Sequence, residues 1–359
     1  MLYENLAKLS ALPGVSGCEE PVRYEILKMI EGHCIYKVDA LGNILAFKKG
    51  KQAPVHPLLF SAHMDEVGLI ITWVEESGLL KFTTVGGIDR RVLPGKSVRI
   101  GETFGVIGSK AVHMKSADER DKAPEPDALF IDIGAKDRDD AFTRVALGDR
   151  AVFTSQYTAF GDGFLRGRAL DDRVGCALLV ELIGSELAYD THFAFTVQEE
   201  TGTTGARTAA YQAGAEIAVA VETTTACDIP GTPPEKVVCS LKKGPVLSFM
   251  DKGTVYDMDL YRRALAAAKA GGIACQPKEG VYGGNEARSV QVAGRGARVL
   301  AVSVPCRYLH TPSCVVNRFD VDETLRLLGA LAADFGVTLR LELYTTEELR
   351  SIITRSAGI

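Results

Sequence analysis

Helix and strand patterns alternate in residues 174–221, which read VGCALLVELIGSELAYDTHFAFTVQEETGTTGARTAAYQAGAEIAVAV. Apolar residues dominate 174–187, which favours a buried helix, and a second helix is predicted at 206–213. The short apolar runs at 193–197 and 217–221 favour buried strands. Strands separated by helices predict an α/β fold in which helices cover both faces of a mixed sheet.

The same alternation continues on both sides of this stretch. Helices are predicted at 2–10, 19–31, 257–269 and 322–335, a hairpin within 35–47, and strands at 58–63 and 299–304. Between them, residues 69–156 show short β-rich runs separated by Gly, Pro and Asp, with almost no helical periodicity. We therefore expect a discontinuous catalytic domain, residues 1–68 plus 157–359, interrupted by an all-β insertion at 69–156.

Composition narrows the function classes. The 359 residues are 46% hydrophobic and 24% charged, with a net charge of -5 and no basic run, so nucleic acid is not an expected partner. No apolar run approaches the ~18 residues of a membrane span, and the N-terminus lacks a signal-peptide pattern. Eight scattered cysteines without a C-x-x-C pair favour reduced thiols. These features predict a cytoplasmic enzyme that binds no membrane.

Acidic and imidazole side chains cluster at or just past the ends of predicted strands, where open α/β sheets place their ligand sites. The clusters are His63-Met64-Asp65-Glu66, Asp171-Asp172, Glu199-Glu200, Glu222 and His310.

His63 and Asp65 are two apart in an extended segment, so both side chains point to one side. His63 suits a metal ligand, and Asp65 suits the group that orients its ring; a polar surface turn is the alternative. Glu199-Glu200 follows an apolar strand, where one carboxylate can bind metal and the other can act as a general base. An exposed acidic turn is the alternative for that pair.

Asp171-Asp172 stands at the entry to a buried helix, so it is either a carboxylate that bridges two metals or a helix cap. Glu222 ends the predicted strand at 217–221, where a buried charge requires a partner or a metal. His310 lies beyond the strand at 299–304, where a structural histidine is the alternative. Two histidines with several carboxylates and no cysteine ligand suit a hydrolytic site with two zinc- or cobalt-like ions.

These motifs resemble those of one metallopeptidase family, the tetrahedral aminopeptidases, which includes glutamyl and deblocking aminopeptidases and members once labelled endoglucanases. The match runs in the same order along the whole chain. The motifs are His63-Met64-Asp65-Glu66-Val67-Gly68, Leu170-Asp171-Asp172-Arg173, Val197-Gln198-Glu199-Glu200 with Gly202 and Gly205, Arg307-Tyr308-Leu309-His310 and, in the insertion, Val85-Gly86-Gly87-Ile88 and Ile131-Asp132-Ile133-Gly134-Ala135.

The resemblance implies a metal-dependent aminopeptidase with two ions. His63 would bind one ion, and Asp171 would bridge both. Glu200 and Glu222 would each bind one ion, and His310 would complete the shell of the second. Divalent zinc or cobalt is expected, with manganese as a further possibility.

The resemblance also assigns the supporting roles. Glu199 would be the general base that activates water, and Asp65 would orient His63. Asp171 is preferred to Asp172 as the bridge because related peptidases place that ligand two residues before a basic residue, here Arg173. Peptides with a free N-terminus would be the substrates. The β insertion would mediate dimerisation, and members commonly build dodecamers.

Three positions depart from the family pattern. Glu222 stands where Asp is more common, Gly283-Gly284-Asn285-Glu286-Ala287 replaces a Gly-Thr-Asp-Ala segment near the substrate, and Cys314 replaces a Glu. Each expected metal-ligand position still holds a residue that can bind metal. The altered positions near the substrate mean that the substrate preference of relatives does not apply to this chain.

Other functions compete with this interpretation. The same site would suit a metal-dependent deacylase or dipeptidase of small amides. A glycosidase would need two carboxylates flanking a sugar and no metal. A non-catalytic scaffold should have lost ligands or the base, yet every expected position holds a competent residue.

Overall fold

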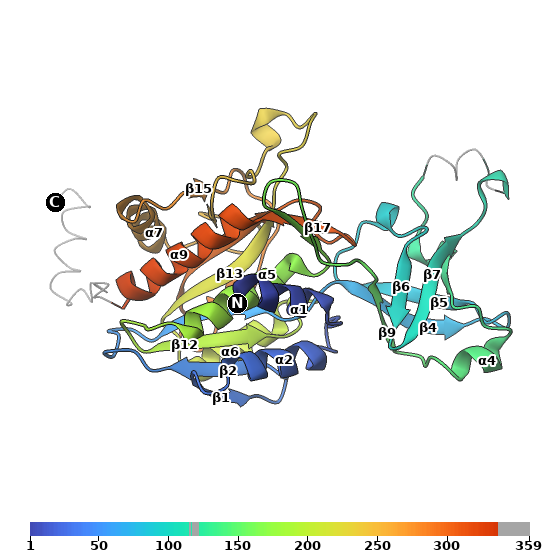
Figure 1. Ribbon diagram of the computed structural model, residues 1–359, viewed down its shortest axis with the longest axis horizontal. Coiled ribbons are helices and arrows are strands. Elements are labelled where there is room, and N and C mark those ends of the chain that lie inside the picture. Colours follow the sequence, from blue (N-terminus) through green and yellow to red (C-terminus); the bar gives the residue numbers. More distant parts are fainter. Residues whose placement is uncertain (115, 117–121, 337–359) are drawn as a thin grey trace, which may run out of the picture.

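A computed structural model describes residues 1–114, 116 and 122–336, which form a larger α/β unit and a smaller β-barrel (Figure 1). The larger unit is built on an eight-stranded sheet in the order β1-β2-β12-β3-β13-β16-β14-β15. Its strands are β1 (Ile35–Val38), β2 (Ile44–Lys48), β3 (Leu58–His63), β12 (Thr191–Thr196), β13 (Ile217–Thr225), β14 (Val246–Leu247), β15 (Gln276–Pro277) and β16 (Arg298–Cys306). The predicted hairpin is confirmed, because β1 pairs antiparallel with β2.

The four central strands, β12, β3, β13 and β16, run parallel to one another. Every residue of β3 is buried, as expected for a strand covered on both faces. The parallel arrangement brings the carboxyl ends of these strands to one edge of the sheet, which is where an open α/β sheet places a ligand site.

Helices cover both faces of this sheet, so the predicted mixed α/β/α architecture is confirmed. One face packs against α1 (Leu2–Ala11), α2 (Glu20–Ile30), α5 (Leu170–Gly184), α7 (Met258–Ala270) and α9 (Arg318–Asp334). The other face packs against α6 (Thr204–Ala213) and α8 (Ala287–Val290).

The alternation of side chains along the strands decides what each face contacts. Leu58 and Phe60 of β3 join the first cluster, whereas Leu59 between them joins the second. The second cluster is rich in alanine, including Ala209 of α6 and Ala220 of β13, which lets this helix lie close to the sheet.

The residues after His63 leave the sheet and form a closed barrel with the strand order β4-β5-β8-β7-β6-β9. The barrel strands are β4 (Gly68–Val74), β5 (Leu80–Val85), β6 (Ser97–Ile100), β7 (Thr103–Ser109), β8 (Leu129–Asp132) and β9 (Arg150–Phe153). Its interior is a separate apolar cluster that includes Leu69, Phe82 and Ile131. The expectation of almost no helix needs one correction, because α4 (Arg138–Phe142) forms where the Asp137 side chain caps the Asp140 N–H.

A three-stranded antiparallel sheet lies beside the larger unit, in the order β10-β11-β17. Its strands are β10 (Thr158–Phe160), β11 (Phe164–Gly167) and β17 (Cys314–Asn317). Short 3-10 turns occupy Arg90–Val92, Val112–Met114, Pro126–Ala128 and Pro234–Lys236. Within the described ranges, no helix has the length and apolar character to cross a membrane.

The expected end of the strand at Val221 is wrong. Strand β13 continues through Thr225, because its last three residues keep their register with Val304–Cys306 of β16. Glu222 therefore lies within the strand rather than after it. Threonine is β-branched and suits such a continuation.

Candidate metal centre

His63 and Asp171 bring together the first group of possible metal ligands. His63 is the last residue of β3, and its Nε2 atom lies 3.5 Å from Asp171 Oδ1 and 3.7 Å from Glu222 Oε2. All three residues are buried. An imidazole facing two carboxylates is a donor set that a divalent zinc-like ion accepts.

His310 and Glu200 form a second group around the other oxygen of the same aspartate. His310, in the loop between β16 and β17, has its Nε2 atom 3.1 Å from Asp171 Oδ2 and 3.3 Å from Glu200 Oε1. Asp171 thus faces one imidazole with each of its oxygens. A third group with ligand atoms within 4.8 Å of one another joins His63, Glu199 and Glu200.

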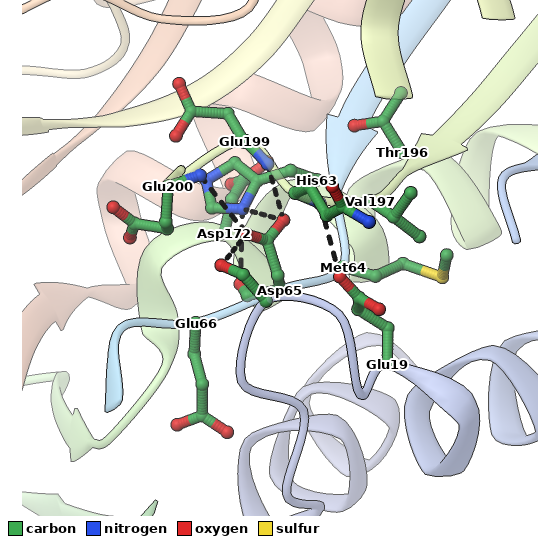
Figure 2. Close-up of polar contacts among 12 residues, drawn as sticks. Glu19, His63, Met64, Asp65, Glu66, Asp172, Thr196, Val197, Glu199 and Glu200 are labelled. Atoms are coloured by element: carbon green, nitrogen blue, oxygen red, sulfur yellow. Dashed lines mark hydrogen bonds and ion pairs between the residues drawn. The ribbon is translucent and has the colours of Figure 1, made fainter. Parts of the chain in front are cut away.

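Asp65 contacts His63 at its Nδ1 atom, the ring nitrogen that does not face Asp171 (Figure 2). Its backbone oxygen lies 3.2 Å from His63 Nδ1, and its carboxylate accepts hydrogen bonds from the N–H groups of Glu199 and Glu200 at 3.0 and 3.1 Å. The Ser16 hydroxyl donates to the same carboxylate at 2.6 Å. Asp65 therefore fixes the ring of His63 and the turn that carries Glu199 and Glu200 at the same time.

Asp172 and Glu66, the neighbours of these residues in sequence, lie outside the three groups. Asp172 is fully buried, and its Oδ1 atom accepts a hydrogen bond from the Gly175 N–H at 2.9 Å inside α5. Glu66 points away from His63 in Figure 2 and pairs with Arg168 at 2.5 Å. Asp171 belongs to two of the possible ligand groups and Asp172 to none, and the bridging role of Asp171 stays a prediction.

Several carboxylates lie close together in the centre and are buried, and this shifts their pKa values. Burial raises the pKa of Glu222 well above its ordinary value and raises that of Glu200 as well. Burial lowers the pKa of His310, but its contacts with Asp171 and Glu200 outweigh this and raise it to about 11. The groups are therefore arranged around a site that favours positive charge.

A further observation indicates that these histidines and carboxylates could hold a metal ion. The Oε1 atom of Glu200 is buried and has no hydrogen-bond partner within the described part of the chain, although it faces His310. A buried carboxylate oxygen without a donor is costly, and a cation would satisfy it. Histidine and carboxylate ligands together suit zinc- or cobalt-like ions.

Two hydroxyl groups form hydrogen bonds to carboxylates of the centre and were not predicted from the sequence. Ser16 reaches Asp65 from the segment before α2, and the Thr223 hydroxyl donates to Asp171 Oδ1 at 2.7 Å. Thr223 directly follows Glu222, so its position in the same strand is the only feature of the sequence that could have indicated it.

A cavity of about 640 Å³ opens onto the centre and is lined by His63, Asp171, Glu199, Glu200, Glu222 and His310. Another cavity of about 660 Å³ lies at the opposite ends of β13 and β16, beside Ile217 and Arg298. It contains no residue of the three ligand groups, so we assign the chemistry to the first cavity.

The α/β/α domain carries histidines and carboxylates at the carboxyl edge of its sheet, an arrangement typical of metal-dependent hydrolases. Comparison with known proteins identifies the family. Residues 42–327 match the family model described as M42 glutamyl aminopeptidase. The chain therefore belongs to this family, whose members hydrolyse peptide bonds as aminopeptidases, and the tetrahedral aminopeptidase resemblance of the motifs is confirmed.

Individual relatives agree with this assignment. A putative aminopeptidase of Acetivibrio thermocellus is 34% identical over 331 residues, covering 91% of this chain and 97% of the relative. The lysyl aminopeptidase of Pyrococcus furiosus is 29% identical, covering 92% and 96%. The TET1 peptidase of Pyrococcus horikoshii, which can assemble into a tetrahedron or a large octahedral shell, superposes with a TM-score of 0.83 at 35% identity, covering 93% and 100%.

Proposed function

We propose that this aminopeptidase uses two divalent metal ions, zinc or cobalt, to release N-terminal residues from peptides. His63 and Glu222 would hold one ion, Glu200 and His310 the other, and Asp171 would bridge them. The observation that carries this proposal is the placement of Asp171, whose two oxygens face two different imidazoles at 3.5 and 3.1 Å. When bound, such ions supply the acidity that activates water and polarises the scissile carbonyl.

Glu199 is the residue we assign as general base. It lines the cavity and belongs to the third group with His63 and Glu200, and Asp65 accepts a hydrogen bond from its backbone N–H at 3.0 Å. Burial and the charges of Glu200 and Asp171 raise the pKa of Glu199 to about 8, against the opposing charge of His63. Since nearby positive charge lowers a carboxyl pKa, bound cations would lower the pKa of Glu199 and favour its ionised form. It can then take a proton from water and pass it to the leaving amine.

The experiment removes metal with a chelator and restores Zn²⁺, Co²⁺ or Mn²⁺ one at a time. Aminoacyl chromogenic substrates are compared with the same substrates carrying an N-acetyl group. Metal-restored release from free amino termini alone supports the proposal. Hydrolysis of the blocked set alone would identify a deacylase, and no turnover with any bound metal would favour a scaffold protein.

We further propose that the chain forms a homo-oligomer through its barrel, residues 69–156, in the cytoplasm. Large apolar side chains lie exposed on the barrel, among them Trp73 at 51%, Phe104 at 69% and Val106 at 48% exposure. Side chains of this size on a surface are typical of protein contacts. The eight unpaired cysteines, four buried and four half-buried, suit a reducing compartment.

The preferred N-terminal residue does not follow from relatedness. The family description names glutamyl peptides and the Pyrococcus furiosus relative is named for lysyl peptides. A preference for this chain has to be argued from its own cavity.

A further inference from the structure

The cavity that opens onto the metal centre also has a cationic part. Lys252, Lys278 and Arg288 line it together with the ligand residues. None of the three belongs to the ligand groups or to the proposed proton transfer. Their positive charges therefore face whatever part of the substrate extends beyond the metal centre.

Lys278 is the buried member of this cationic part, with 6% of its surface exposed. Its ammonium donates to the Tyr282 carbonyl at 2.8 Å, which uses one of its three donors. It lines the same cavity as His63, Asp171 and Glu222. Burial lowers the pKa of Lys278, and the charges of Asp251 and Glu222 oppose that shift. No carboxylate forms an ion pair with Lys278 in the regions that the structure describes, so a buried cation faces the cavity unpaired.

Lys252 and Arg288 are the exposed members. Lys252 lies on the loop after β14, and Arg288 lies in the short helix α8. The Lys252 N–H donates to the Gly283 carbonyl at 2.9 Å, which joins this loop to the segment that precedes α8. A Cβ at Gly253 would meet Arg288 Cδ at 3.0 Å, so the absence of a side chain there leaves room for the arginine stem. Over the described residues neither side chain has a salt-bridge partner.

The segments that carry Lys252 and Arg288 are held by a buried polar network. Asp251, 1% exposed, accepts hydrogen bonds from the N–H groups of Gly253 and Thr254 at 2.7 and 2.8 Å. Its other oxygen accepts from the Tyr256 hydroxyl at 2.5 Å, and that hydroxyl accepts from the Asn285 amide at 3.0 Å. The backbone beside Lys252 and Arg288 is therefore held in place before any substrate arrives, which lowers the entropy lost on binding.

We propose that Lys252, Lys278 and Arg288 bind a carboxylate of the substrate. This inference rests on the proposed aminopeptidase function, since the metal centre must hold the reacting peptide bond. A peptide offers such a carboxylate from two sources, the side chain of an acidic N-terminal residue or the free C-terminus of a very short peptide. Charge-assisted hydrogen bonds from lysine and arginine recognise both in the same way.

The test uses two substrate pairs that differ only in charge. Glutamyl- and glutaminyl-aminomethylcoumarin differ at the side chain, and Leu-Gly and Leu-Gly-amide differ at the C-terminus. The ratio of kcat/KM within each pair is measured for the wild type, Lys278→Met and the double variant Lys252→Met with Arg288→Met. Lys269→Met, an exposed lysine on α7, is the control. The double variant changes only exposed side chains, so it serves if Lys278→Met fails to fold.

A fall of about tenfold or more in the ratio for one pair, with the control unchanged, identifies the source of the carboxylate. Ratios that stay at the wild-type values in every folded variant overturn the proposal. If the metal-loaded wild type hydrolyses none of the four compounds, their binding is measured by calorimetry and the same ratios of affinity decide. Charge discrimination without turnover would contradict the proposed function alone.

Discussion

The two carboxylate oxygens of Asp171 face different histidines, and each histidine also faces a glutamate. His63 and Glu222 lie on neighbouring parallel strands, while Glu200 and His310 come from the loops that follow the strands. No short segment of the chain could supply this set. The centre therefore exists only because the parallel strands end at one edge of the sheet.

Replacement of the proposed general base tests its role directly. Glu199→Gln keeps the size and the backbone hydrogen bond to Asp65 but removes the proton acceptor. We expect kcat to fall by about 10²–10⁴-fold with nearly unchanged metal content, measured by steady-state kinetics and elemental analysis. A variant with wild-type kcat would contradict the assignment of the base.

The Thr223 hydroxyl, which donates to Asp171, allows a second test of the centre, with a matched control in the same strand. Thr223→Val removes the 2.7 Å hydrogen bond to Asp171 Oδ1 while keeping the β-branched shape. We expect metal affinity to fall by about 10–100-fold, as for other groups that orient a metal ligand. Thr225→Val, at the exposed end of β13, should keep wild-type affinity in the same chelator competition. Equal affinities for both variants would show that Thr223 does not hold the ligand.

The sequence predicted the residues that the structure brings together as possible metal ligands, but it did not predict the groups that support them. His63, Glu200 and Glu222 stand out because each lies at or just past the end of an apolar run, which for Glu222 stops inside strand β13. Ser16 and Thr223 act through hydroxyl groups, which are common, and their partners lie far away in the chain. Contacts between residues so far apart in the chain depend on the fold, and no local pattern in the sequence predicts them.

Among the helices and strands, the buried central ones were predicted, and two short peripheral ones, β10 and α4, were missed. Strand β3 is an apolar run that the structure reproduces at residues 58–63, whereas β10 is exposed along its full length and has no hydrophobic alternation. Helix α4 has five residues, too few to show a helical period. The exposed edge strand β1 was predicted because it alternates and is followed by the turn at Gly42-Asn43, a signal that β10 and α4 lack.

A buried ion cluster joins the elements that carry the centre. Glu66, after β3, pairs with Arg168 at 2.5 Å and with Arg173 of α5 at 3.4 Å, and Arg173 is fully buried. Glu66→Ala leaves two buried guanidinium groups without their carboxylate, so we expect the free energy of unfolding to fall by about 3–5 kcal/mol.

The control for this variant is Glu76→Ala, which breaks an ion pair between Arg138 and a glutamate that is 83% exposed. A surface pair of this kind should contribute about 0–1 kcal/mol. Urea denaturation followed by circular dichroism measures both. Similar losses for the two variants would mean that the buried cluster does not stabilise the fold.

The whole molecule combines an α/β unit, which holds the candidate metal centre, with a barrel whose described residues include none of the possible ligands. Phe104 and Val106 alternate with buried positions along β7, so their side chains lie together on the outside of the barrel. Phe104→Glu places a charge on this surface and should shift the protein to smaller assemblies in light scattering after size-exclusion chromatography. Tyr211→Glu, which changes an equally exposed aromatic residue on α6, should keep the wild-type mass. An unchanged mass for Phe104→Glu would exclude this face of the barrel as the contact.

We infer that two metal ions share Asp171. This can be tested in a crystal structure of zinc-loaded protein, with anomalous scattering collected on both sides of the zinc absorption edge. We expect two zinc peaks per chain, one bound by His63 and Glu222, one by Glu200 and His310, and both by Asp171. A single peak, or a second peak that Asp171 does not contact, would contradict it.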